Sequence, residues 1–95
     1  MGGELFLASI GGCFASTLLA AVKARGADVS DIRTEVIGSL ADPPARFSAV
    51  EICVSANCSD RELLERLVEI AERGCIIANT LRGKLDLTIR IAAPV

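Results

Sequence analysis

The fold is decided by the stretch LFLASIGGCFASTLLAAV, Leu5–Val22, which carries no charged residue in 18 positions. Ala and Leu dominate it, and Lys23, Arg25 and Gly26 follow it, as is typical of the carboxyl end of a helix. A segment of this length is just long enough to cross a membrane. Its middle is small and only mildly apolar, and no aromatic belt flanks it, so we favour a helix surrounded by protein over a membrane span.

Two segments with a period of two follow this helix and indicate strands. Across residues 32–40 one face carries four side chains, Ile32, Thr34, Val36 and Leu40. Across residues 48–56 the corresponding set is Val50, Ile52 and Val54. The turn residues Asp42-Pro43-Pro44-Ala45 lie between them, so the pattern predicts an antiparallel hairpin.

A second helix and a third strand complete the chain. Ser59 is expected to open the helix, because Glu62 three residues later would complete a capping box, and Gly74 is expected to end it. The strand Lys84–Ala92 alternates, with Leu85, Leu87, Ile89 and Ile91 facing inward. The order α-β-β-α-β indicates a single α+β domain over residues 1–95, with the long helix packed on an antiparallel sheet.

The chain contains more apolar residues than a single small domain can bury. The chain has 95 residues, of which 52% are hydrophobic, more than a small soluble monomer usually needs. Three strands cannot surround a helix that is apolar on every side. We therefore predict that a second copy completes the fold as a homodimer.

Several functional classes are disfavoured by the same composition. A net charge of −2 and the lack of Trp and Tyr argue against a nucleic acid partner, and the lack of His removes the commonest metal ligand. We expect no cofactor and no membrane partner. Glu4 stands where a signal peptide would be basic, so we expect a cytoplasmic chain with reduced thiols.

Two of the four cysteines have unusual neighbours. Cys13 follows Gly11 and Gly12, which would let a backbone or a small substrate approach closely. Cys75 follows Gly74 and would lie at a corner between two helices if Asn79 and Thr80 cap a new turn. A free cysteine usually packs as a small hydrophobe, however, so either one taken alone is more often structural than reactive.

The other two cysteines give a weaker signal. Cys53 falls on the outward face of its strand, and Cys58 precedes the expected helix cap. A zinc site built from the four cysteines would have no C-x₂-C pair, so we expect no metal and interpret Cys53 and Cys58 as incidental thiols.

Two motifs together resemble the OsmC/Ohr family. ELFLASIGGCF (4–14) resembles the family's first cysteine motif, and ERGCIIANT (72–80) resembles the second. The separation of 62 positions from Cys13 to Cys75, with a hairpin and a helix between them, also matches. The resemblance covers essentially the whole chain.

This resemblance implies that the chain forms a homodimer with an interwoven sheet and that it acts as a thiol-dependent peroxidase. Cys13 would attack hydrogen peroxide or an organic hydroperoxide and become a sulfenic acid, Cys75 would condense with it, and a dithiol reductant would reopen the disulfide. Glu4 would match the acidic position of some OsmC-like branches. The alternative is a catalytically silent OsmC-like domain that serves as a dimeric binding or structural module.

The resemblance also implies parts that this chain does not match. Family members have N-terminal strands, and in the hydroperoxide-resistance branch these strands carry an Arg that stabilises the thiolate. No residue here corresponds to either, so we expect Cys13, within an apolar helix, to keep a high pKa and to react slowly. Arg82 is the best substitute cation that the sequence offers.

Overall fold

The long helix dominates the computed structural model, which describes residues 2–92. This helix, α1 (Gly2–Arg25), extends the uncharged segment at both ends. Glu4 lies in its first turn and Lys23 and Arg25 in its last, which suits the helix dipole. Gly26 then adopts a φ of 58°, the left-handed conformation that commonly ends helices.

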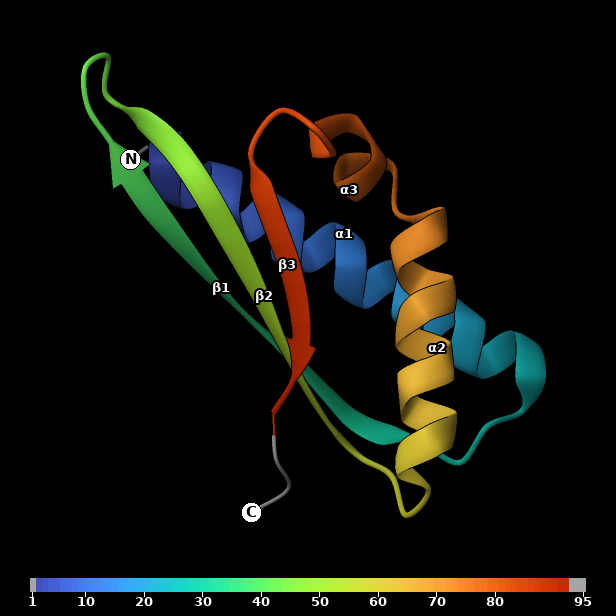
Figure 1. Cartoon of the computed structure of the whole chain (residues 1–95). Helices are drawn as coiled ribbons and strands as arrows, with labels where there is room; N and C mark the ends of the chain where they lie inside the picture. Colours follow the sequence, from blue (N-terminus) through green and yellow to red (C-terminus); the bar gives the residue numbers. More distant parts are fainter. Residues whose placement is uncertain (1, 93–95) are drawn as a thin grey trace.

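Three strands form one sheet in the order β1-β2-β3 (Figure 1). β1 (Ser30–Ala41) and β2 (Arg46–Asn57) form the predicted antiparallel hairpin. β3 (Asp86–Ile91) pairs with β2 in parallel, so the prediction of a wholly antiparallel sheet is wrong for this strand. The reason is the connection, because two helices carry the chain back before it re-enters the sheet, as parallel pairing requires.

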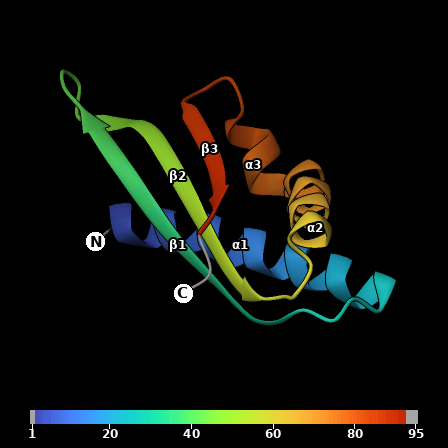
Figure 2. The ribbon, with the colours of Figure 1, turned by 60° about the horizontal axis from the view of Figure 1, so that its bottom comes forward.

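The helices form a layer on one face of this sheet (Figure 2). α1 packs against β1, against α2 (Arg61–Gly74) and against the short α3 (Ile76–Leu81). The α+β class is therefore confirmed. The second half of the chain contains one more helix than the order α-β-β-α-β counted.

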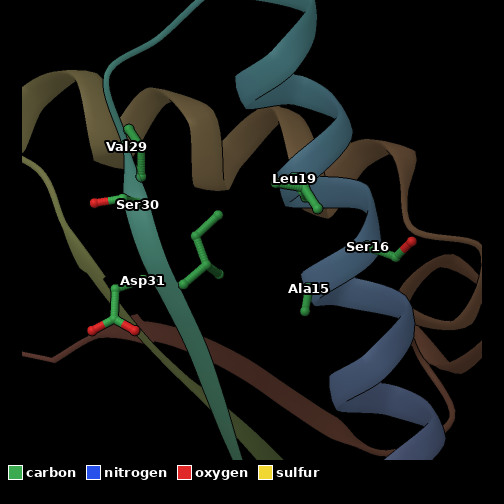
Figure 3. A pocket seen from close by; sticks show the side chains of 7 residues that line it. Ala15, Ser16, Leu19, Val29, Ser30 and Asp31 are labelled. Carbon is green, nitrogen blue, oxygen red and sulfur yellow. The ribbon is translucent and has the colours of Figure 1, made fainter.

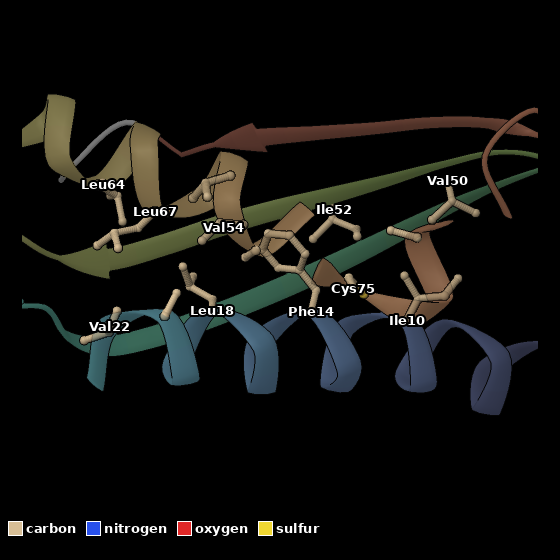
Figure 4. Packing of buried hydrophobic residues seen from close by; sticks show 14 residues of the cluster. Ile10, Phe14, Leu18, Val22, Val50, Ile52, Val54, Leu64, Leu67 and Cys75 are labelled. Atoms are coloured by element: carbon tan, nitrogen blue, oxygen red, sulfur yellow. The ribbon is translucent and has the colours of Figure 1, made fainter. Parts of the chain in front are cut away.

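The core lies between this helical layer and β2 (Figure 4). α1 contributes one residue per turn, β2 contributes its inward face, and α2 contributes the apolar side that the sequence predicted. The largest fully buried side chains from these three elements are Ile10, Phe14, Leu18, Val50, Ile52, Val54 and Leu67.

Only one side of α1 is buried within the chain. On the opposite side Leu5 is 64% exposed and Leu19 is 43% exposed. By length and composition alone α1 would be able to cross a membrane, a property that buried helices of soluble proteins and signal sequences share. This chain therefore covers one side of α1, and the prediction that protein surrounds the whole helix stays a prediction for the other side.

Two local details differ from the expected pattern. Leu40 is 73% exposed although the period of two placed it on the same face as the half-buried Ile32 and Val36, because the strand register shifts between Ser39 and Leu40. The cap of α2 is Asp60, whose carboxylate accepts from the Leu63 N–H at 3.2 Å, and not Ser59. Both are shifts of one residue within elements whose type was predicted correctly.

A glycine allows the close contact between α1 and β1. A Cβ on Gly11 would lie 2.9 Å from Val36 Cγ2 and 3.2 Å from Thr34 Oγ1. The Thr34 hydroxyl also donates to the Gly11 carbonyl at 3.3 Å. Gly11 therefore has a packing role, whereas among residues 2–92, apart from the adjoining residues and backbone of its own helix, nothing lies within 4 Å of a Cβ on Gly12.

Candidate functional site: a pair of thiols between α1 and α3

The structure brings the two predicted cysteines together. Cys13 lies midway along α1 and is half-buried, and Cys75 lies between α2 and α3 and is fully buried. The Cys75 thiol donates to Cys13 Sγ at an S–S distance of 3.3 Å. The predicted proximity is thus confirmed, with both residues as free thiols.

Cys75 forms the corner between the two helices, as the sequence suggested. Its backbone is extended, with φ −81° and ψ 116°, which ends α2 and starts α3 in a new direction. Its N–H donates to the Glu72 carbonyl at 3.4 Å, and its carbonyl accepts from the Asn79 N–H at 3.0 Å. Asn79 and Thr80 lie inside α3 and do not cap it, since the N-cap position belongs to Cys75 itself.

The environment of Cys13 favours the thiolate. Hydrogen bonding from the backbone of Ile77 is the main cause that lowers the pKa of Cys13, followed by the Cys75 thiol, and burial opposes the shift only in part. Ile76 and the Thr17 hydroxyl act in the same direction on this pKa. The expectation of a high pKa was therefore wrong, because Cys13 is not enclosed by its apolar helix and α3 presents N–H groups to its sulfur.

The environment of Cys75 favours the neutral thiol. Burial is the main cause that raises the pKa of Cys75, and the adjacent Cys13 sulfur adds to it. Hydrogen bonding from the backbone of Ala78 opposes the shift in part. The pair therefore has an order: Cys13 loses its proton first, and Cys75 remains protonated beside it as a hydrogen-bond donor.

Glu4 and Arg82 are the other two residues that the sequence put forward for this site. Glu4 precedes Cys13 by nine residues on one helix, a separation of about 13 Å along the axis. Arg82 donates to Glu72 Oε2 at 3.1 Å and to Asn79 Oδ1 at 3.0 Å. Within its own chain Arg82 thus holds the end of α2 and α3 together.

Sequence reasoning missed the backbone of Ile76 and Ile77 and the hydroxyl of Thr17. Backbone donors leave no trace in residue type, so only the expectation of a helical turn after Cys75 pointed toward them. Thr17 follows Cys13 by four residues, which places it above Cys13 on the same helix face, and that spacing was available as a signal.

The other cysteines lie apart from this pair. Cys53 is aligned with Glu35 on β1 and with Arg90 on β3, on the outward face of the sheet. The Cys58 thiol donates to the Asp60 carbonyl at 3.2 Å, just before α2. Among residues 2–92, no three Cys, Asp or Glu side chains are grouped so that they would hold a metal ion.

A cavity of about 440 Å³ opens elsewhere, between α1 and the start of β1 (Figure 3). Neither Cys13 nor Cys75 lines it, and its lining residues are Ala15, Ser16, Leu19, Val29, Ser30, Asp31 and Ile32. It is therefore a separate surface feature beside the exposed side of α1.

Comparison with solved structures shows the same fold in several proteins. The organic hydroperoxide resistance protein OsmC from Legionella pneumophila superposes with a TM-score of 0.84 at 23% identity, over 95% of this chain and 67% of that one. OhrB, the organic hydroperoxide resistance protein of Bacillus subtilis, gives a TM-score of 0.75 at 24% identity, over 93% and 67%. An OsmC-like protein of unknown function from Vibrio cholerae gives 0.80 at 18% identity, over 94% and 62%.

These likenesses establish the fold, and the chain spans about two thirds of the length of the two hydroperoxide resistance proteins. No curated protein matches the chain in sequence. The family model for OsmC-like proteins, in contrast, matches residues 2–90, which is nearly the whole chain. With its fold and its two cysteine motifs in place, this chain belongs to the family of OsmC-like proteins.

Proposed function

We propose that the chain is a thiol-dependent peroxidase in which Cys13 is the nucleophile and Cys75 the resolving thiol. The observation that carries this proposal is a pair of free thiols 3.3 Å apart whose pKa values shift in opposite directions, down for Cys13 and up for Cys75. A peroxidase with two cysteines needs one thiolate that attacks the peroxide and a second thiol that stays protonated until the sulfenic acid has formed. The opposite pKa shifts of Cys13 and Cys75 suit these two roles.

The reaction balances with these two residues and an external dithiol. The Cys13 thiolate attacks the terminal oxygen of a hydroperoxide, the O–O bond breaks, and the alkoxide leaves as an alcohol after taking a proton. The sulfur of Cys75 then attacks the sulfenic acid and water leaves as the disulfide forms. A dithiol reductant restores both thiols, and a reducing compartment such as the cytoplasm would supply it.

The surroundings of Cys13 support an organic hydroperoxide as the substrate. Space is open above Gly12, one residue away, where a methyl group in place of the glycine hydrogen would meet no other part of the described chain within 4 Å beyond its own helix. Ile76, whose backbone hydrogen-bonds to the Cys13 sulfur, leaves its side chain 76% exposed. An alkyl or aryl group attached to the peroxide would have an apolar contact at this position.

We further propose that the working unit is a homodimer. The uncovered side of α1 is apolar, and its exposed large side chains, Leu5 and Leu19, match what an interface between copies requires. Ile76 is exposed near the thiol pair, so a second copy packed there would also shape the substrate entrance. Glu4, distant from Cys13 in its own chain, is proposed to act from the partner chain.

The proposal is tested by titrating the reduced protein with cumene hydroperoxide. One equivalent should consume both thiols of the pair and yield a Cys13–Cys75 disulfide, detected by peptide mapping. The Cys75→Ser variant should instead accumulate a sulfenic acid at Cys13 that dimedone traps. Unchanged thiols in the wild type would refute the peroxidase and favour the silent binding module.

A further inference from the structure

The corner that carries Cys75 is tied together by exposed side chains. Asn79 Nδ2 donates to the Arg73 carbonyl at 3.0 Å. Arg82 Nη1 donates to Asn79 Oδ1 at 3.0 Å, and Arg82 Nη2 donates to Glu72 Oε2 at 3.1 Å. We call Glu72, Asn79 and Arg82 the corner clasp.

The clasp joins two elements across one extended residue. Glu72 and Arg73 belong to the last turn of α2, Asn79 belongs to α3, and Arg82 caps its end. Cys75 is the break between these helices, and its N–H bonds to the Glu72 carbonyl three residues back in place of the helical partner four residues back. The angle between α2 and α3 therefore depends on the side chains that bridge the break.

The clasp is suited to positioning more than to overall stability. Arg82 and Glu72 have side chains that are 50% and 41% exposed, and exposed ion pairs contribute little to folding. The guanidinium nevertheless holds two acceptors at once, which fixes their relative placement. A small change in that placement would act directly on the buried Cys75, whose thiol donates to Cys13 Sγ.

We propose that the corner clasp positions the dithiol: Asn79 and Arg82 hold Cys75 Sγ against Cys13 Sγ and so favour the disulfide over the two separate thiols. The inference deepens the proposed function and rests on its assumption that these two cysteines form a redox pair. Disulfide formation requires the sulfurs to approach by roughly 1.2 Å, to the S–S bond length of about 2.05 Å. A loosely held corner would make this approach less frequent.

The test is the equilibrium between the pair and glutathione, measured on the full chain. Oxidised glutathione accepts two electrons and the two thiol protons, its own disulfide is cleaved to two molecules of glutathione, and the Cys13–Cys75 bond forms. Asn79→Ala and Arg82→Ala should each lower the equilibrium constant for the protein disulfide about fivefold, the size expected for a hydrogen bond that holds the geometry. The reduction potential of the pair should become less negative accordingly.

Two further variants separate positioning from general damage. Arg82→Lys can reach one of the two acceptors but not both, so it should restore part of the loss. Arg61→Ala removes another exposed ion pair of α2, to Glu65 at 3.4 Å, at the end of the helix distant from Cys75. This control should leave the equilibrium constant unchanged.

The outcomes distinguish this inference from the proposed function. A wild type that forms the disulfide, with Asn79→Ala and Arg82→Ala unchanged or equal to Arg61→Ala, overturns the positioning role alone. A wild type that forms no disulfide at any glutathione ratio overturns both. The expected losses at Asn79 and Arg82, with partial recovery in Arg82→Lys, establish the clasp as a positioning device.

Discussion

The pKa values of Cys13 and Cys75 shift in opposite directions, because hydrogen bonding dominates at one sulfur and burial at the other. Cys13 is half-buried and receives backbone N–H groups from the start of α3, while Cys75 is enclosed by the core. A thiolate is stabilised by donors and destabilised by burial. Reactivity at this site is therefore a property of the contact between two segments and not of either motif alone.

The pH dependence of alkylation tests this asymmetry. The pKa of Cys13 is lowered and that of Cys75 is raised, so Cys13 should be thiolate at lower pH. Alkylation by iodoacetamide, followed at each cysteine by mass spectrometry, should rise at a lower pH for Cys13 than for the unfolded chain, and at a higher pH for Cys75. A Cys13 midpoint equal to or above the Cys75 midpoint would contradict the assignment of nucleophile and resolving thiol.

At the scale of the elements, the contact between α1 and β1 fixes where Cys13 lies over the sheet. Gly11 makes this contact possible, because its missing side chain leaves room for Val36 and Thr34. A structural reason therefore exists for one of the two glycines before Cys13. The other, Gly12, is left uncovered by the rest of the described chain, so a substrate or a second copy could approach it.

Substitution of Gly11 tests this packing. Gly11→Ala would place a methyl group 2.9 Å from Val36 Cγ2 and should lower the free energy of unfolding by about 1–3 kcal/mol, despite the better helix propensity of Ala. Val36→Ala removes the opposing methyl group, so the double variant should be more stable than the sum of the single effects predicts, by about 0.5–3 kcal/mol. Purely additive effects in chemical denaturation would show that the close contact is absent.

Residue patterns predicted the elements well and their connections less well. The hairpin, the apolar side of α2 and the alternation in β3 were readable because each depends on a local period. The parallel pairing of β3 was not, because strand direction depends on the path of two helices through space. The shift at Leu40 and the cap at Asp60 were missed because one residue of register leaves the hydrophobic period nearly unchanged.

For the site, the sequence supplied the two sulfurs but not what surrounds them. Cys13 and Cys75 were found through the paired motifs, and their proximity is confirmed. The donors that lower the pKa of Cys13 come from the backbone of α3, a six-residue helix with no sequence period of its own. Arg82 was put forward as a substitute cation that would reach the thiolate across the dimer, and within its own chain it bridges α2 and α3.

For the whole molecule, the unburied side of α1 is an uncovered apolar surface of the single chain, which carries the exposed side chains of Leu5 and Leu19. Leu19 is 43% exposed there, beside the cavity between α1 and β1 (Figure 3). A second copy that covers this side would complete the helical layer and would bring further residues close to the thiol pair. Oligomeric state and activity should therefore be linked.

A charge on this side of α1 tests the homodimer. Leu19→Arg should raise the dissociation constant of the dimer about tenfold or more, because an unpaired guanidinium would be buried at the interface. Glu69→Arg places the same side chain on the exposed side of α2 and should leave association unchanged. Analytical ultracentrifugation measures both, and a wild type that remains a folded monomer at micromolar concentration would contradict the proposal.

The central claim is that Cys13 reduces hydroperoxides with the help of Cys75, and stopped-flow kinetics with cumene hydroperoxide test it most directly. With a dithiol reductant present, the wild type should turn over, and Cys13→Ser should abolish the reaction. Cys75→Ser should keep the first oxidation of Cys13 but lose efficient turnover, because the sulfenic acid would lack its resolving thiol. A wild-type rate no faster than that of Cys13→Ser would contradict the claim.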